Sequence, residues 1–197
     1  MALMNNDLAR GLYADEINCL ASRMLGDVSP YFANAAAARE ETKSRVPVRW
    51  LGVFARDQIP QDLEQQQRPF ALIFNTDPAD KPGQHWLALY GPKDGPLELF
   101  DSFALHPSLY SFDAYSLVYS TTPLQSTSTA TCGHYCLYFL YLSSHNRPFN
   151  LIVNMAKAAL SPDHYVFSYV QHLQFVYRVL NPCHCSGQCS QIKCLFC

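Results

Sequence analysis

The chain has 197 residues, of which 49% are hydrophobic and 15% are charged. This length and composition fit a single folded domain with a substantial buried core, and they exclude a disordered chain. With 14 basic and 16 acidic residues the net charge is −2, which gives no electrostatic reason to expect nucleic acid or an anionic membrane as the main partner.

The sequence also lacks the segments that direct a chain into or across a membrane. It has no run of about 18 apolar residues, the length that a transmembrane helix needs. The first residues, 1–7, lack the basic start and apolar core of a signal peptide. We therefore expect a protein that is not secreted and that works in a reducing compartment.

The eight cysteines are distributed unevenly. Only Cys19, Cys132 and Cys136 precede residue 183, and the other five fall in the last fifteen residues. A disulfide framework would spread through the fold. We therefore divide the chain into one domain, residues 1–182 with a helical part over 1–48, and a cysteine-rich tail, residues 183–197. The tail's thiols, with or without His184, could bind zinc, but their spacing fits a metal-free tail equally well and we assign no metal.

Helices are predicted at both ends of the domain. Residues 15–25 carry apolar side chains at helical spacing, and Gly26 ends that pattern. A second helix is predicted over 33–43. Towards the other end, helices are predicted from residue 132 to about 142, over 150–160, and from a Ser161 cap and Pro162 to residue 180.

The strands are predicted between these helices. Residues 70–74 form a continuous apolar run, typical of a central buried strand. Residues 86–90 and 97–100 are separated by a hairpin turn rich in glycine and proline. The remaining segments are a short apolar stretch at 50–54, a surface loop or short helix over 59–68, and a weaker strand at 116–120. Helices, a sheet and then helices indicate an α+β domain.

Cys132 marks an abrupt change along the chain. The polar, Ser/Thr-rich residues 124–131 precede it and an apolar helical run follows. In the first turn of a helix, free N–H groups and the helix dipole surround the sulfur and favour a reactive thiolate. Gln125, seven residues earlier, has an amide that can donate to a developing oxyanion. The alternative is a buried cysteine that acts as a small hydrophobe, and Cys136, one turn further, fits that description.

A cysteine nucleophile needs a histidine, an orienting group and oxyanion donors. His85 directly precedes the strand at 86–90, and Asp101 directly follows the strand at 97–100. If the two strands form an antiparallel hairpin, both side chains fall on the same rim. Each residue alone is more often a surface or turn residue. Together with Cys132 and Gln125, they indicate a hydrolytic site.

Several motifs in this order resemble a known family. The sequence at 84–89, the sequence at 99–103 and the spacing from Gln125 to Cys132 resemble the adenain family, the adenovirus-type cysteine endopeptidases. These belong to the clan that also contains the ubiquitin-like-protein proteases. The resemblance extends over about residues 50–154. It implies a permuted papain-like fold, in which a small mixed sheet packs on a central helix that carries the nucleophile.

The resemblance also implies a role for each motif residue. Cys132 would be the nucleophile, His85 the general base and acid, and Asp101 the group that orients the histidine. Gln125 and the backbone N–H of Cys132 would form the oxyanion hole.

Two further residues would support the site. Trp86 would pack beside the histidine, and Gly133 would allow a close backbone approach. The chain departs from the adenovirus enzymes at Asp101, where they usually have glutamate and the ubiquitin-like-protein proteases have aspartate. It also has no cysteine over 112–124, where adenovirus enzymes link an activating peptide. Its net charge of −2 differs from the basic character of those DNA-activated enzymes. We therefore expect no required cofactor, with a peptide or DNA activator disfavoured.

The expected function is a cysteine endopeptidase that processes viral or transposon structural precursors during particle maturation. A divergent virus or a transposon of the Maverick/Polinton type suits the mixture of features. One alternative is a protease that removes ubiquitin-like modifiers, and another is an inactive interaction module, against which the complete set of four residues argues. We expect a monomer acting on capsid or core precursor proteins, without a membrane partner. Its expected location is the virion and host nucleus if viral, and otherwise the nucleus or cytoplasm.

Overall fold

The computed structural model describes residue 8, residues 10–26 and residues 47–180. The helix predicted over 33–43 and the cysteine-rich tail lie outside the described residues. The domain boundary at residue 182 therefore stays a prediction.

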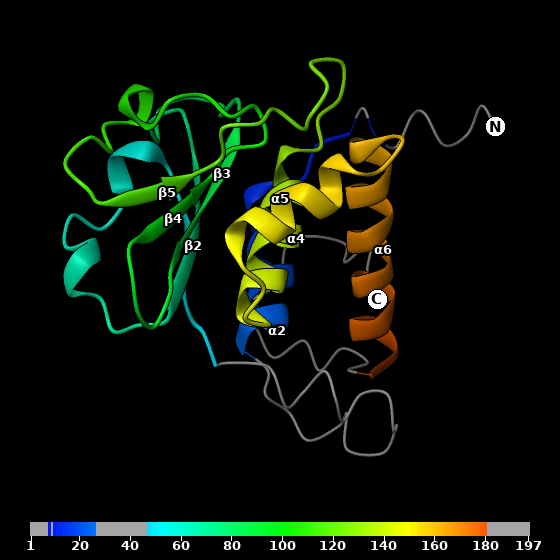
Figure 1. Ribbon diagram of the computed structural model, residues 1–197, viewed down its shortest axis with the longest axis horizontal. Helices are drawn as coiled ribbons and strands as arrows, with labels where there is room; N and C mark the ends of the chain where they lie inside the picture. The colour runs from blue at the N-terminus through cyan, green and yellow to red at the C-terminus, as the bar shows by residue number, and fades with distance from the viewer. Residues whose placement is uncertain (1–7, 9, 27–46, 181–197) are drawn as a thin grey trace.

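A five-stranded mixed sheet forms one side of the molecule (Figure 1). Its strands lie in the order β1-β2-β3-β4-β5. The pairs β1–β2 and β4–β5 are parallel, and the pairs β2–β3 and β3–β4 are antiparallel. The strands are β1 (Arg49–Phe54), β2 (Phe70–Asn75), β3 (Trp86–Gly91), β4 (Leu97–Phe100) and β5 (Leu117–Tyr119). The predicted strands are confirmed, including the weaker one near the sheet edge.

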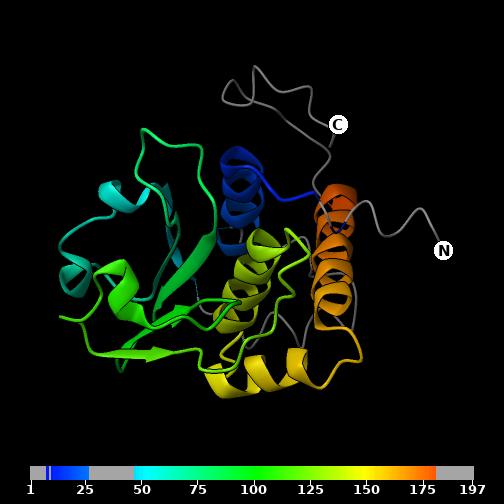
Figure 2. The ribbon, with the colours of Figure 1, turned by 90° about the horizontal axis from the view of Figure 1, so that it is seen from above.

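Helices cover one face of this sheet. The described helices are α2 (Ala14–Gly26), α4 (Cys132–Ser144), α5 (Phe149–Lys157) and α6 (Pro162–Leu180). Helices α2 and α4 lie side by side next to the sheet, and α6 lies on their outer side (Figure 2). None of the helices in the described part of the chain has the length and apolar character needed to cross a bilayer.

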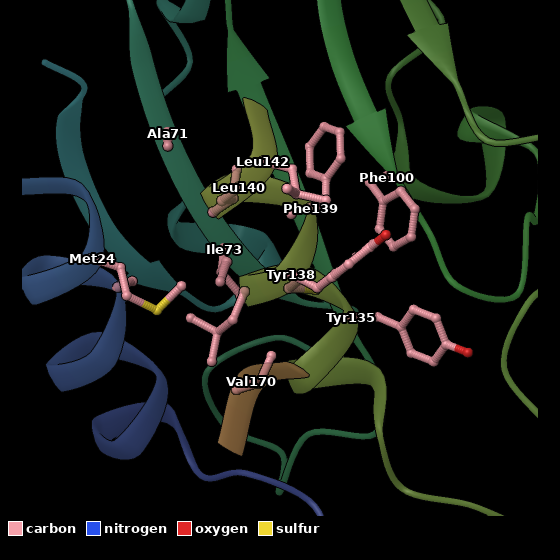
Figure 3. Packing of buried hydrophobic residues seen from close by; sticks show 14 of the residues in the cluster. Met24, Ala71, Ile73, Phe100, Tyr135, Tyr138, Phe139, Leu140, Leu142 and Val170 are labelled. Atoms are coloured by element: carbon pink, nitrogen blue, oxygen red, sulfur yellow. The ribbon is translucent and has the colours of Figure 1, made fainter. Parts of the chain in front are cut away.

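Helix α4 occupies the centre of the molecule. Every residue of it except Tyr141 is buried, because the sheet, α2 and α6 surround it. Helices that are apolar on all sides are typical of such central positions. Phe100 of β4 stacks on Phe139 with ring centroids 4.9 Å apart, and both rings are visible in the core (Figure 3).

Both faces of the sheet are buried. Ala71 and Ile73 of β2 face the helices. The alternate residues Leu72 and Phe74 face a second apolar cluster on the other side, which includes Leu63. Because side chains alternate along a strand, only a strand covered on both faces is apolar at every position. The continuous apolar run of β2 is therefore explained by its position inside the sheet.

The architecture is thus a mixed α/β domain with a five-stranded mixed sheet and four described α-helices. One predicted boundary is wrong: α5 ends at Lys157 and not at residue 160. The N–H of Ala159 bonds to Ala156 O at 3.2 Å, a tighter i to i+3 bond that closes the last turn. The residues that follow are needed to turn the chain into Pro162, where α6 begins.

Candidate active site

His85 and Asp101 meet at one end of the sheet. Ala88 of β3 pairs with Phe100 of β4 in antiparallel register, so the start of β3 lies beside the end of β4. His85 Nε2 lies 2.7 Å from Asp101 Oδ1, and the two side chains are buried. The juxtaposition predicted from the hairpin is therefore confirmed.

The carboxylate of Asp101 is held from several sides. Oδ1 also accepts the N–H of Phe103 at 2.8 Å, and Oδ2 accepts the N–H of Leu105 at 3.1 Å and the hydroxyl of Tyr110 at 2.8 Å. Burial favours the protonated acid, but the hydrogen bond and charge of His85, together with Phe103 and Tyr110, hold the pKa of Asp101 below its usual value. The site therefore contains an ionised carboxylate in a fixed orientation.

The histidine is shifted towards its charged form. Burial by itself lowers the pKa of His85, but hydrogen bonds and charge interactions with Asp101 and Cys132 outweigh it and raise the pKa to about 9. Since Nε2 bonds to Asp101, the other ring nitrogen, Nδ1, is left for Cys132. The ring of Phe103 packs against the imidazole with centroids 4.6 Å apart.

Cys132 is the first residue of α4 and is 7% exposed. Thr131 precedes it at the N-cap position, yet the threonine side chain makes no capping bond to the helix. Its Oγ1 donates instead to Asp163 at 2.9 Å. Thr131 therefore makes no capping bond that would occupy the positive end of the helix dipole beside the thiol. Cys136, one turn further, is fully buried, and burial raises its pKa well above the usual value, as expected of a core residue.

The side chain of Gln125 is buried and oriented by two bonds. Its Oε1 accepts from Ser102 Oγ at 2.7 Å, and its Nε2 donates to Thr129 O at 2.9 Å. Because a backbone carbonyl only accepts, the Thr129 contact fixes which end of the amide is the NH₂ group. One N–H of that group is then left to donate elsewhere. Sequence reasoning missed Ser102, since no local pattern links it to a residue 23 positions away.

A loop over residues 76–84 leads into His85, and Asn75 braces it. Asn75 Oδ1 accepts the N–H groups of Asp77 at 2.9 Å and Gln84 at 3.1 Å. Gly83 has a φ of +88°, and a Cβ added there would come within 2.7 Å of the Asn75 side chain. The loop therefore needs glycine at this position. The sequence does contain a signal for this contact, because Asn75 is a polar residue at the end of an otherwise apolar strand.

An open cleft of about 890 Å³ lies beside the site. Its lining includes His85, Gln125 and Cys132. The N-terminal segment, residues 10–15, forms another part of the lining, together with parts of the loop at 77–84. Sequence reasoning assigned no site role to the N-terminal segment. It is held there because Leu8 O accepts the N–H of Ala130 at 3.0 Å.

One of the two supporting residues, Trp86, is placed differently from the expectation. The ring that packs on His85 is Phe103, whereas the indole N–H of Trp86 donates to Leu12 O at 3.1 Å and secures the N-terminal segment. Trp86 nevertheless lines the cleft. A Cβ on Gly133 would lie 3.1 Å from Ile17, so this glycine allows α2 and the segment before it to approach α4.

Among the described residues, no group of three or more His, Cys, Asp or Glu side chains is placed to hold a metal ion. The cysteines of the tail lie outside the described residues.

Comparison with known proteins gives one informative match. The chain is 30% identical to the protease of porcine adenovirus A serotype 3 in an alignment of 113 residues, which covers 47% of this chain and 54% of that protease. The match thus spans about half the length of the viral protein. No family model matches the chain.

A solved structure was also found. The central domain of the uncharacterized Lpg1148 protein from Legionella pneumophila is 12% identical, with a TM-score of 0.45 over 88% of this chain and 100% of that domain. The sequence similarity to a viral protease is therefore the finding that bears on function, and it is limited to about half of each chain.

Proposed function

We propose that this protein is a cysteine endopeptidase of the adenain type, with a permuted papain-like fold. The observation that carries the proposal is the buried His85–Asp101 pair, whose histidine lines the same cleft as Cys132 at the start of a central helix. The similarity to an adenovirus protease over about half the chain supports the same reading.

The chemistry follows from the geometry. The Cys132 thiolate attacks the carbonyl carbon of the substrate, a C–S bond forms, and the carbonyl electron pair moves to the oxygen. The free N–H of Gln125 and the backbone N–H of Cys132 stabilise that oxyanion. The C–N bond then breaks as protonated His85 gives its proton to the leaving amine. Water hydrolyses the thioester, with His85 accepting its proton.

The substrates that we propose are structural precursor proteins of a virus or a virus-like transposon. A second candidate, removal of ubiquitin-like modifiers, is favoured by the aspartate at position 101. The two are separated by substrate: a short peptide with an aliphatic residue a few positions before a glycine-containing cleavage site, against a folded modifier fusion ending in Gly-Gly.

The test compares thiol labelling in the wild type and in matched variants. A thiol-reactive probe at neutral pH should label Cys132, as located by mass spectrometry, and His85→Ala should abolish that labelling. Cys132→Ala should lose both labelling and hydrolysis of the cleaved substrate. Cys136→Ala is the matched control, because it removes a thiol one turn away from the cleft, and it should keep both.

An unlabelled Cys132 in a folded wild-type protein, together with no cleavage of either substrate class, would overturn the proposal. The protein would then be a non-catalytic interaction module.

A further inference from the structure

The loop between Gln125 and Cys132 must hold two hydrogen-bond donors in a fixed relative position. If the proposed function is right, the amide of Gln125 and the N–H of Cys132 must converge on one oxygen atom. Residues 126–131 nevertheless contain no helix or strand. The bonds inside the loop, such as Ser126 Oγ to Ser128 Oγ at 2.8 Å, join residues two or three positions apart and tie the loop to no other element. Its position relative to the rest of the site must therefore be set by contacts with other elements.

One carboxylate contacts both ends of this loop. Asp163 Oδ2 accepts the N–H of Ser126 at 3.0 Å, and Asp163 Oδ1 accepts from Thr131 Oγ1 at 2.9 Å. Ser126 directly follows Gln125, and Thr131 directly precedes Cys132. The Asp163 side chain is buried.

We propose that Asp163 is a positioning residue for the oxyanion hole, one that sets the distance between the Gln125 amide and the Cys132 N–H. This inference rests on the proposed function. Asp163 does not line the cleft, so it acts through the loop and not on the substrate.

The chemistry of the position suits a carboxylate. Two oxygens can accept two separate donors, and hydrogen bonds to an ionised acceptor are stronger than neutral ones. Asp163 is the second residue of α6, where the helix dipole stabilises a negative charge. Val166 and Val170 of the same helix are completely buried in the core, so the loop is tied to a rigid element.

The proposal separates two steps of the reaction. The Asp163 carboxylate bonds to Ser126 and Thr131 and lies outside the cleft that His85 and Cys132 line, so its loss should leave the His85–Cys132 pair intact. Alkylation of Cys132 by iodoacetamide displaces iodide and forms no oxyanion, whereas peptide hydrolysis does. Asp163→Ala should therefore lower kcat by about 10- to 100-fold, at or below the lower end of the 10²–10³ cost of losing a whole oxyanion donor, because Gln125 is displaced and not removed. KM and the alkylation rate should stay within about two-fold of the wild type.

The experiment is a double-mutant cycle of Asp163→Ala with Gln125→Ala, read by kcat, KM and the iodoacetamide rate. If Asp163 acts by placing Gln125, its loss should cost at most about three-fold once Gln125 is absent. Asp163→Asn should recover most of the rate, because its oxygen can accept from Ser126 and its NH₂ can donate to Thr131. His164→Ala, an exposed change on the same helical turn, is the control.

Thr131→Val removes one of the two bonds with little change in size, and it carries the same test if Asp163→Ala does not fold. Equal losses in hydrolysis and alkylation, or fully additive effects in the cycle, would overturn the inference while leaving the proposed function in place. A folded wild type without labelling at Cys132 and without hydrolysis would overturn the proposed function, and this inference with it.

Discussion

The two halves of the candidate site are held by different kinds of structure. His85 and Asp101 sit at the ends of paired strands, so the ladder between β3 and β4 sets their separation. Gln125 and Cys132 are joined by an irregular loop. The Asp163 side chain bonds to this loop, and the Ser102 side chain bonds to the Gln125 amide. A backbone ladder tolerates most side-chain changes, whereas a side-chain bond is lost with one substitution. We call His85 and Asp101 the acid–base half of the site, and Gln125 and Cys132 the oxyanion half. Substitution of a supporting residue should therefore reduce activity less in the acid–base half than in the oxyanion half.

Among substitutions that leave the nucleophile in place, His85→Ala should produce the largest effect, because it removes the group that handles the proton in both steps. We expect kcat to fall by about 10²- to 10⁴-fold, the range for lost general acid–base catalysis. Alkylation of Cys132 at neutral pH should be lost as well, since the imidazolium partner of the thiolate is gone. His106→Ala, at an exposed position, is the control. Hydrolysis within ten-fold of the wild type in His85→Ala would remove His85 from the mechanism.

Asp101→Asn tests the acid–base half of the site through the pH dependence of hydrolysis. Hydrolysis needs protonated His85 to release the amine, so kcat/KM of the wild type should decline as the pH rises through about 9. Without the Asp101 charge, the interactions that raise the pKa of His85 weaken, while burial, which lowers that pKa, remains. The decline should move to lower pH. An unmoved alkaline limb would show that another group titrates there.

Ser102 and Ser120 provide a matched pair, one serine for each half. Both are buried: Ser102 donates to Gln125, and Ser120 bonds to the backbone N–H and O of Asp101. Ser102→Ala should lower kcat by about ten-fold, a fraction of the loss of a whole oxyanion donor, without changing alkylation. Ser120→Ala should reduce hydrolysis and alkylation together by less than about five-fold, because the strand pairing still holds Asp101. If Ser102→Ala and Ser120→Ala changed hydrolysis and alkylation in the same way, the two halves would not differ in how they are held.

The sequence predicts the two halves unequally, for the same physical reason. Strand periodicity and a turn rich in glycine and proline place His85 opposite Asp101, and the change from polar to apolar residues locates Cys132 at a helix start. These are local signals. The bonds of Gln125 to Ser102 and of the loop to Asp163 join residues 23 and 37 positions apart. Serine and aspartate at such positions are also common as turn and cap residues, so nothing local distinguishes them.

The N-terminal wall of the cleft escaped prediction for a related reason. Residues 10–13 precede α2 and show no period that would assign them to a helix or strand. They are held by tertiary bonds, such as the indole N–H of Trp86 to Leu12 O. A resemblance that begins near residue 50 could not reach them either.

His134 tests whether stability can be changed without affecting either half. It lies two residues after Cys132 on α4 but does not line the cleft, and its ring packs against Phe167 of α6 with centroids 4.9 Å apart. Burial, together with the positive charge of Arg10, lowers the pKa of His134 to about 4. The native state therefore keeps this histidine neutral in a range where the unfolded chain binds a proton.

Since the unfolded state binds more protons between pH 6.5 and about 4, stability should fall as the pH decreases through this range. A shift from 6.5 to about 4 corresponds to at most about 3 kcal/mol, at 1.36 kcal/mol per pKa unit. His134→Phe should remove this loss, as measured by urea unfolding at several pH values. The difference between the two proteins is the quantity to use, because burial raises the pKa of Glu98 to about 7 and changes stability in the opposite direction. Equal slopes of stability against pH in the two proteins would exclude His134 as the titrating group. If His134→Phe removes the slope and leaves kcat unchanged, the stability of α4 can be changed without affecting either half of the site.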